Sequence, residues 1–166
     1  MCVCVCTAVN GAAPAAGALL AMSCDYRVMA PDYVIGLNET KFGLVAPTWF
    51  VDVTVNTVGH RKAEKLLFPG TLVTTLEALQ MGMIDEMPAT GDEVEAVAAE
   101  RCVAMMKGVD RRARHETKCS VRAAPMQRLR DNREADLKWF VDFAMNPVTQ
   151  DNLAKYMEAL KAKGKK

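Results

Sequence analysis

The stretch VIGLNETKFGLVAP, residues 34–47, joins two apolar runs through one carboxylate, Glu39. The first run ends at Gly36, so we expect Glu39 at the mouth of a buried strand, with apolar residues on both sides. Burial disfavours the charged form of a carboxylate and raises its pKa, which makes a glutamate a usable base near neutral pH. The alternative is a solvated glutamate in a surface turn, and this window alone, with Asn38 in it, favours that alternative.

Composition indicates a globular protein. The chain has 166 residues, of which 51% are apolar and 25% charged, with a net charge of +1. This length is typical of one domain, and the apolar content argues against disorder. The small net charge argues against coating nucleic acid. No apolar run approaches the roughly 20 residues of a membrane helix, and no signal or transit peptide is visible in the sequence.

The cysteines are predicted to be reduced structural thiols. Cys2, Cys4 and Cys6 alternate along one extended stretch and so share a face, whereas Cys24, Cys102 and Cys119 are isolated in the sequence. A metal site needs a second cluster of ligands, and the chain has only two histidines, far apart. We therefore expect no metal site.

The first elements read as a strand, a tight turn and a helix. Residues 2–9 are small or β-branched on both faces, as in a strand buried on both sides. Asn10-Gly11 indicates a turn, and residues 12–22 read as a small-residue helix with Pro14 near its start. Backbone N–H groups at such a helix start can stabilise a developing negative charge. Close packing of helix on sheet explains the small residues equally well.

Strand and helix patterns alternate through the next part of the chain. Strands are expected at 24–30 and 33–37, helices at 49–58 and 60–68, and a strand–helix–strand unit at 72–87. This alternation predicts an α/β fold with crossover connections. From residue 91 the pattern is helical, with Pro125 as an interruption and amphipathic helices at 131–145 and 149–160. We therefore divide the chain into a core, 1–90, and a helical region, 91–166.

Two side-chain groups of the helical region allow two interpretations each. The apolar stripe Leu137, Phe140, Val141 and Ala144 fits core or a subunit interface. The second group is basic and fits a solvated helix face or a phosphate-bearing ligand. Aromatic residues are not interleaved with it, so base stacking on nucleic acid is poorly supported. The basic group consists of Arg111, Arg112, Arg114, Lys118, Arg122, Arg128, Arg130 and Arg133.

Several motifs, in their order and spacing, resemble the crotonase (enoyl-CoA hydratase/isomerase) superfamily. They are NGAAPAAG at 10–17, CDYR at 24–27, GLNET at 36–40 and GLVAP at 43–47. The last two are similar to the Δ3,Δ2-enoyl-CoA isomerase branch in particular. The resemblance implies a partial crotonase-type spiral of strand–helix repeats, followed by C-terminal helices.

The resemblance also implies a chemistry, the shift of a double bond from 3-enoyl-CoA to trans-2-enoyl-CoA. Glu39 matches the glutamate that moves the proton, and Ala16 matches the residue whose N–H helps hold the enolate oxygen. Leu19 stands where hydratases carry a second catalytic carboxylate, which favours isomerisation over hydration. Gly17, Leu44 and Phe140 are expected to contact substrate. Coenzyme A is part of the substrate, and no other cofactor is implied.

Partners and location follow from the resemblance as expectations. They are an acyl-CoA substrate, a homotrimer, the mitochondrial matrix, and no nucleic acid or membrane partner, with 91–166 serving trimerisation and as a pocket lid. Ala16 replaces a glycine usual in the family, and the family's first half, which supplies the other oxyanion N–H, is absent from this sequence. The alternative is therefore a truncated, non-catalytic assembly or acyl-CoA-binding module.

Overall fold

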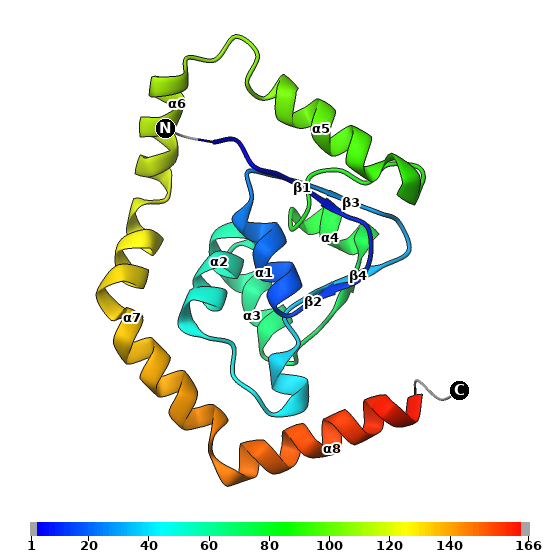
Figure 1. Cartoon of the computed structure of the whole chain (residues 1–166), viewed down its shortest axis with the longest axis vertical. Helices are drawn as coiled ribbons and strands as arrows, with labels where there is room; N and C mark the ends of the chain where they lie inside the picture. The colour runs from blue at the N-terminus through cyan, green and yellow to red at the C-terminus, as the bar shows by residue number, and fades with distance from the viewer. Residues whose placement is uncertain (1–2, 164–166) are drawn as a thin grey trace.

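A parallel strand pair joined by a helix forms the first unit of the computed structural model, which describes residues 3–163. Strand β1 (Cys6–Val9) pairs with β3 (Tyr26–Met29), and helix α1 (Ala16–Ser23) lies between them in the chain (Figure 1). Parallel strands need such a crossover, because the chain must return to the same end of the sheet. The α/β class predicted from the sequence is thus confirmed.

A second sheet contains the strand that leads to the candidate glutamate, Glu39. It contains β2 (Ala13–Pro14), β4 (Val34–Gly36) and β5 (Val73–Thr74), with β2 parallel and β5 antiparallel to β4. Just beyond β2, the Ala15 N–H donates a hydrogen bond of 2.8 Å to the Gly36 carbonyl oxygen. The turn that opens α1 is therefore tied to the strand that leads to Glu39.

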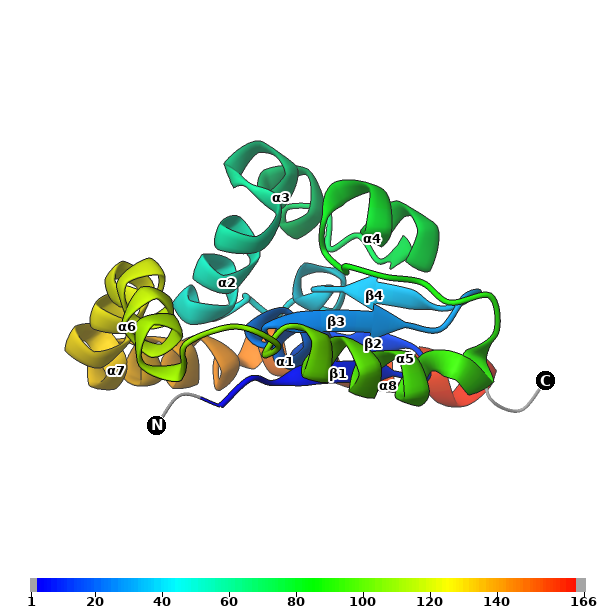
Figure 2. The ribbon, with the colours of Figure 1, turned by 90° about the horizontal axis from the view of Figure 1, so that it is seen from above.

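Helices cover the strands on two sides. On one side are α2 (Thr48–Val58), α3 (His60–Leu67) and α4 (Thr75–Met81) (Figure 2). On the other side α5 (Val94–Ala104), preceded by a 3-10 turn at Gly91–Glu93, packs on β1 and β3. The main core includes Leu19, Met29, Ile35, Phe50 and Ile84. A smaller cluster under α5 joins Val28 and Ala30 to Val94 and Ala98.

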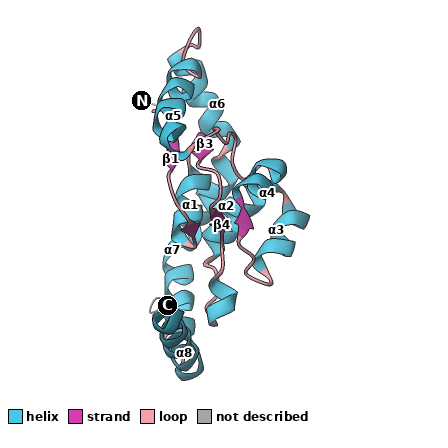
Figure 3. Ribbon diagram, turned by 90° about the vertical axis from the view of Figure 1, so that its right-hand side faces the viewer, coloured by secondary structure: helices cyan, strands magenta, loops and turns pink. Residues whose placement is uncertain are grey.

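The last three helices run along the edge of this core (Figures 1 and 3). They are α6 (Arg111–Val121), α7 (Ala123–Ala144) and α8 (Pro147–Lys163). Helix α8 returns to the 3-10 turn η1 (Glu39–Phe42), where the rings of Phe42 and Tyr156 lie 5.0 Å apart between centroids. Within the described part of the chain, no helix has the length and apolar character needed to cross a membrane.

Several predicted boundaries are wrong. The helix expected at 12–22 begins at Ala16, because Ala13 and Pro14 pair with β4 instead. The strand expected near 83–87 contributes a single bridge, Val28 to Glu86. Pro125 does not interrupt a helix but lies in the first turn of α7, where its missing N–H breaks no helical hydrogen bond. The first strand begins at Cys6, and Cys2 lies outside the described residues.

Gly36 is predicted to tolerate no side chain. Its φ is +144°, and an added Cβ would lie 2.8 Å from the Thr71 carbonyl oxygen. We expect Gly36→Ala to lower the free energy of unfolding by about 2 kcal/mol or more, measured by urea denaturation. Gly11→Ala is the matched control, because nothing lies within 4 Å of its added Cβ. Equal stability of the two variants would contradict the prediction.

Candidate active site

Glu39 is buried, so the solvated-turn alternative is wrong. It opens η1 three residues after β4 ends, and 5% of its surface is exposed. Its neighbours Ile35, Gly36 and Leu37 are also buried. Gly43 ends the turn in the left-handed conformation, with φ 76°, and the Leu44 N–H donates to the Glu39 carbonyl oxygen at 3.0 Å. The backbone therefore holds the glutamate on a tight, hydrogen-bonded turn.

One oxygen of the Glu39 carboxylate has no hydrogen-bond partner among the described residues. Among the described residues, Glu39 Oε2 and Asn38 Oδ1 are buried without a hydrogen-bond partner. Burial raises the pKa of Glu39, and a hydrogen bond from its own backbone N–H opposes that rise only in part. A buried carboxylate without a counter-charge binds a proton more readily than a solvated one. Glu39 is therefore suited to accept a proton and to hold it.

The start of α1 offers donors for a negative charge. The first intrahelical hydrogen bond runs from the Leu19 N–H to the Ala15 carbonyl oxygen at 3.2 Å, so the N–H groups of Ala16 and Gly17 precede the helical ladder. Such N–H groups, together with the helix dipole, favour an anion. The positive φ in this turn, 51°, falls on Ala15, so the Cβ of Ala16 does not meet the strain that its replacement of a glycine suggested.

The β2–β4 pairing brings these two features to one part of the molecule. The Gly36 carbonyl oxygen accepts a hydrogen bond from the Ala15 N–H, next to the start of α1, and Glu39 follows Gly36 by three residues. Three residues span at most roughly 11 Å, which limits the distance between the two backbones. Leu19 is buried in the same core as Leu37, so the position expected to hold a hydratase carboxylate is apolar packing.

Phe140 lies elsewhere, in a cleft of about 580 Å³ between α2 and α7. The cleft is mainly apolar, and Glu39 is not among its lining residues. Leu44 stands between η1 and α2, on the segment that leads from the glutamate to this cleft. A contact of Phe140 with substrate stays a prediction. The cleft is lined by Pro47, Trp49, Phe50, Leu129, Arg130, Arg133, Asp136, Leu137 and Phe140.

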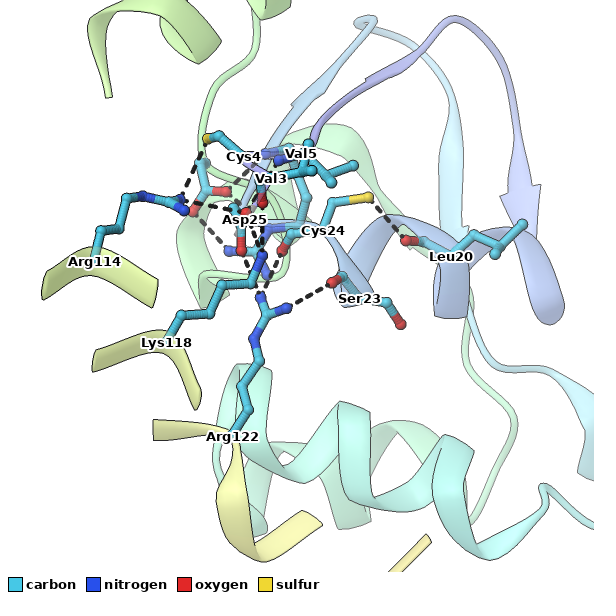
Figure 4. Close-up of polar contacts among 12 residues, drawn as sticks. Val3, Cys4, Val5, Leu20, Ser23, Cys24, Asp25, Arg114, Lys118 and Arg122 are labelled. Atoms are coloured by element: carbon cyan, nitrogen blue, oxygen red, sulfur yellow. Dashed lines mark hydrogen bonds and ion pairs between the residues drawn. The ribbon is translucent and has the colours of Figure 1, made fainter. Parts of the chain in front are cut away.

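Much of the basic group serves the fold. Arg114 and Lys118 of α6, and Arg122 directly after it, bind the carboxylate of Asp25, at 3.4, 2.7 and 2.9 Å (Figure 4). The Val5 N–H donates to the same carboxylate at 3.0 Å. Farther along, Arg128 pairs with Asp52 at 3.0 Å. These cations are matched by internal carboxylates, which removes much of the reason to expect a phosphate ligand there.

The sequence argument missed the roles of three residues that shape this region. Ala15 carries the strained turn, Gly36 accepts its hydrogen bond, and Asn38 is buried beside Glu39. None has a sequence signal, since each role depends on pairing between distant segments. Treating Cys102 as isolated is also wrong, because its sulfur lies within 4.8 Å of those of Cys4 and Cys6.

Comparison with known proteins identifies the family to which this chain belongs. The profile of the enoyl-CoA hydratase/isomerase family matches residues 2–166. The chain belongs to this family. It is 45% identical to enoyl-CoA delta isomerase 1, mitochondrial, of Mus musculus over 159 residues, which is 95% of this chain and 54% of the mouse protein. It is 40% identical to a probable enoyl-CoA hydratase of Mycobacterium leprae over 93 residues, 56% of this chain and 37% of that protein.

A solved structure confirms the family's fold. The crystal structure of human mitochondrial Δ3-Δ2-enoyl-CoA isomerase superposes with a TM-score of 0.88 at 42% identity, covering 94% of this chain and 60% of that one. The expected crotonase-type arrangement of strand–helix repeats is therefore confirmed. The chain spans about half the length of the curated relatives that it matches.

Asp25 is predicted to be essential for docking α6. Burial alone would raise the pKa of Asp25, but the hydrogen bonds from Lys118 and Val5 and the nearby cationic charges lower it below 3.8. This stabilisation is present above the unfolded-state pKa of 3.8 and is lost as pH falls through the lower folded-state pKa. We expect Asp25→Asn to cost about 3 kcal/mol at pH 7 by urea denaturation. Asp142→Asn, in an exposed pair with Lys138, should change little.

Glu39 is predicted to destabilise the fold as pH rises. Its raised pKa means that the folded state keeps a proton which the unfolded state has lost, so stability falls as pH rises from 4.5 through the folded-state pKa. Glu39→Gln should therefore become more stable than the natural protein as pH increases, in urea unfolding at a series of pH values. The exposed Glu116→Gln should follow the natural curve. Parallel curves for Glu39→Gln and the natural protein would refute the burial argument.

Proposed function

We propose that this chain carries the proton-transfer site of an isomerase that converts 3-enoyl-CoA to trans-2-enoyl-CoA during the β-oxidation of unsaturated fatty acids. The observation that carries the proposal is Glu39, buried and without a hydrogen-bond partner for Oε2 among the described residues. It stands three residues beyond the strand tied to the start of α1. The names of the mouse and human relatives, enoyl-CoA delta isomerase 1, support this reaction.

The chemistry needs one base and an anion site. The Glu39 carboxylate removes a proton from C2, between the thioester and the double bond, and the electron pair moves onto the thioester oxygen. The Ala16 N–H helps to stabilise that oxygen. Glu39 then delivers its proton to C4 as the double bond re-forms between C2 and C3. The raised pKa of Glu39 suits both steps, because the side chain must gain a proton and then give it back.

Leu19 favours isomerisation over addition of water. Hydration requires groups that activate and position a water molecule, whereas a proton shuttle works with one base. Leu19 is 6% exposed and packs in the apolar core, and its side chain supplies neither a charge nor a hydrogen bond. The apolar surroundings also suit a fatty acyl chain, and Leu44 and Phe140 remain the candidates to contact it.

Assembly and location belong to the same proposal. Apolar side chains are exposed along α7 and α8, including Leu137, Met145 and Val148, and a homotrimer would cover such a surface. In this reading residues 91–166 supply the trimer contacts and the pocket lid. The relatives' names point to mitochondria. Coenzyme A arrives with the acyl substrate, and the chemistry above uses no other cofactor.

The proposal predicts that turnover depends on the Glu39 carboxylate. Glu39→Gln should lower the rate of conversion of a 3-enoyl-CoA by about 10²–10⁴-fold, because the amide cannot shuttle a proton. The rate is measured by the absorbance of the conjugated trans-2-enoyl product. Exposed Glu116→Gln is the matched control and should keep full activity.

Undiminished turnover in Glu39→Gln would refute the role of Glu39. Because the chain spans about half of its curated relatives, an acyl-CoA-binding module without turnover is the second candidate. Isothermal titration with an enoyl-CoA and the turnover assay on the same preparation separate the two. Binding with no conjugated product favours the module.

A further inference from the structure

Three cysteines from two distant parts of the chain meet on one side of the core. Cys6 opens β1, Cys4 lies two residues before it, and Cys102 faces them from α5. All three Sγ atoms lie within 4.8 Å of one another, and all three residues are half-buried. Residues two apart on an extended segment point to the same face, which explains why Cys4 and Cys6 both reach α5.

The backbone around these thiols is held from both sides. Between the two strand cysteines, the Val5 N–H donates to Asp25 Oδ2 at 3.0 Å. Next to Cys102, the guanidinium of Arg101 binds Glu86 through two hydrogen bonds of 2.6 and 2.8 Å. The Cys102 thiol also donates a weak hydrogen bond to the Cys4 carbonyl oxygen, which lies 3.7 Å from its sulfur. The three thiols are therefore positioned by contacts that do not depend on any ligand.

We propose that Cys4, Cys6 and Cys102 bind one thiophilic divalent metal ion of the Zn²⁺ class, with water as the fourth ligand. Tetrahedral zinc with Zn–S bonds of about 2.3 Å places its sulfur ligands about 3.8 Å apart. The sulfurs already lie within 4.8 Å of one another, so small side-chain rotations bring them to that spacing. A ligand set of thiols alone selects soft ions over Mg²⁺ or Ca²⁺.

The local charge suits a divalent ion. Binding converts three thiols and one M²⁺ into a tris-thiolate complex of net charge −1 and releases three protons to solvent. Arg114 Nη2 lies 3.3 Å from Cys4 Sγ and offsets that charge. The release of these protons on binding is measurable in weak buffer.

The test is an anaerobic titration of the reduced chain with Cd²⁺, followed by the ultraviolet sulfur-to-metal charge-transfer band, and competition with Zn²⁺. We expect one ion per chain. The affinity for Zn²⁺ should fall by more than about 100-fold in Cys6→Ser and in Cys102→Ser, beyond the loss of about 10–100-fold that removal of a supporting contact causes. Cys24→Ser and Cys119→Ser are the controls, since neither thiol belongs to the cluster. Circular dichroism of the metal-free proteins checks that each variant is folded.

X-ray absorption of the Zn²⁺-loaded natural protein gives a readout that needs no variant. Three sulfur neighbours around zinc support the proposal, and fewer than three overturn it. Unchanged affinity in both Cys6→Ser and Cys102→Ser overturns it, as does binding that Cys119→Ser abolishes. Absence of the charge-transfer band in the natural protein overturns it too, and leaves the thiols as packing residues.

Discussion

One hydrogen bond, from the Ala15 N–H to the Gly36 carbonyl oxygen, joins the two halves of the candidate site. It extends the short β2–β4 pairing into the turn that opens α1, and Ala15 adopts a positive φ to make it. Gly36 must be glycine for the strands to approach, because a side chain would meet the Thr71 carbonyl oxygen. The spacing between the helix start and the glutamate therefore depends on backbone contacts, which side-chain substitutions elsewhere leave intact.

Burying Glu39 without a counter-charge costs stability and raises its pKa. A carboxylate shielded from water and lacking a cationic partner is costly to ionise, and that cost is what brings its pKa toward the range of a useful proton carrier. Asp25 shows the opposite arrangement, because its side chain, 7% exposed, is surrounded by Lys118, Arg114 and Arg122. The pKa of a carboxyl group is thus raised at Glu39 and lowered at Asp25, according to the partners that each one has.

The sequence predicted what depends on local pattern. The α/β class and the helices at 60–67 and 75–81 follow from periodicity. The window around Glu39 alone favoured a solvated turn, and the burial of Glu39 became visible only in the structure. Contacts between distant segments could not be read in the same way. The two-residue strand at Ala13–Pro14 has no strand signal of its own, and Cys102 reaches Cys4 and Cys6 only because α5 packs on β1. The basic residues on and after α6 could not be assigned to Asp25 from the sequence, because the two segments are far apart in the chain.

The clamp on Asp25 spans a long stretch of chain. Lys118, its nearest cationic partner, lies 93 positions later in the sequence. Contacts of such separation form late, because a large loop must close before they stabilise anything. On the ribosome, the first strand and the α1 crossover are made long before α6 emerges. The carboxylate of Asp25 therefore has none of its three cationic partners until α6 and the residue after it have been synthesised.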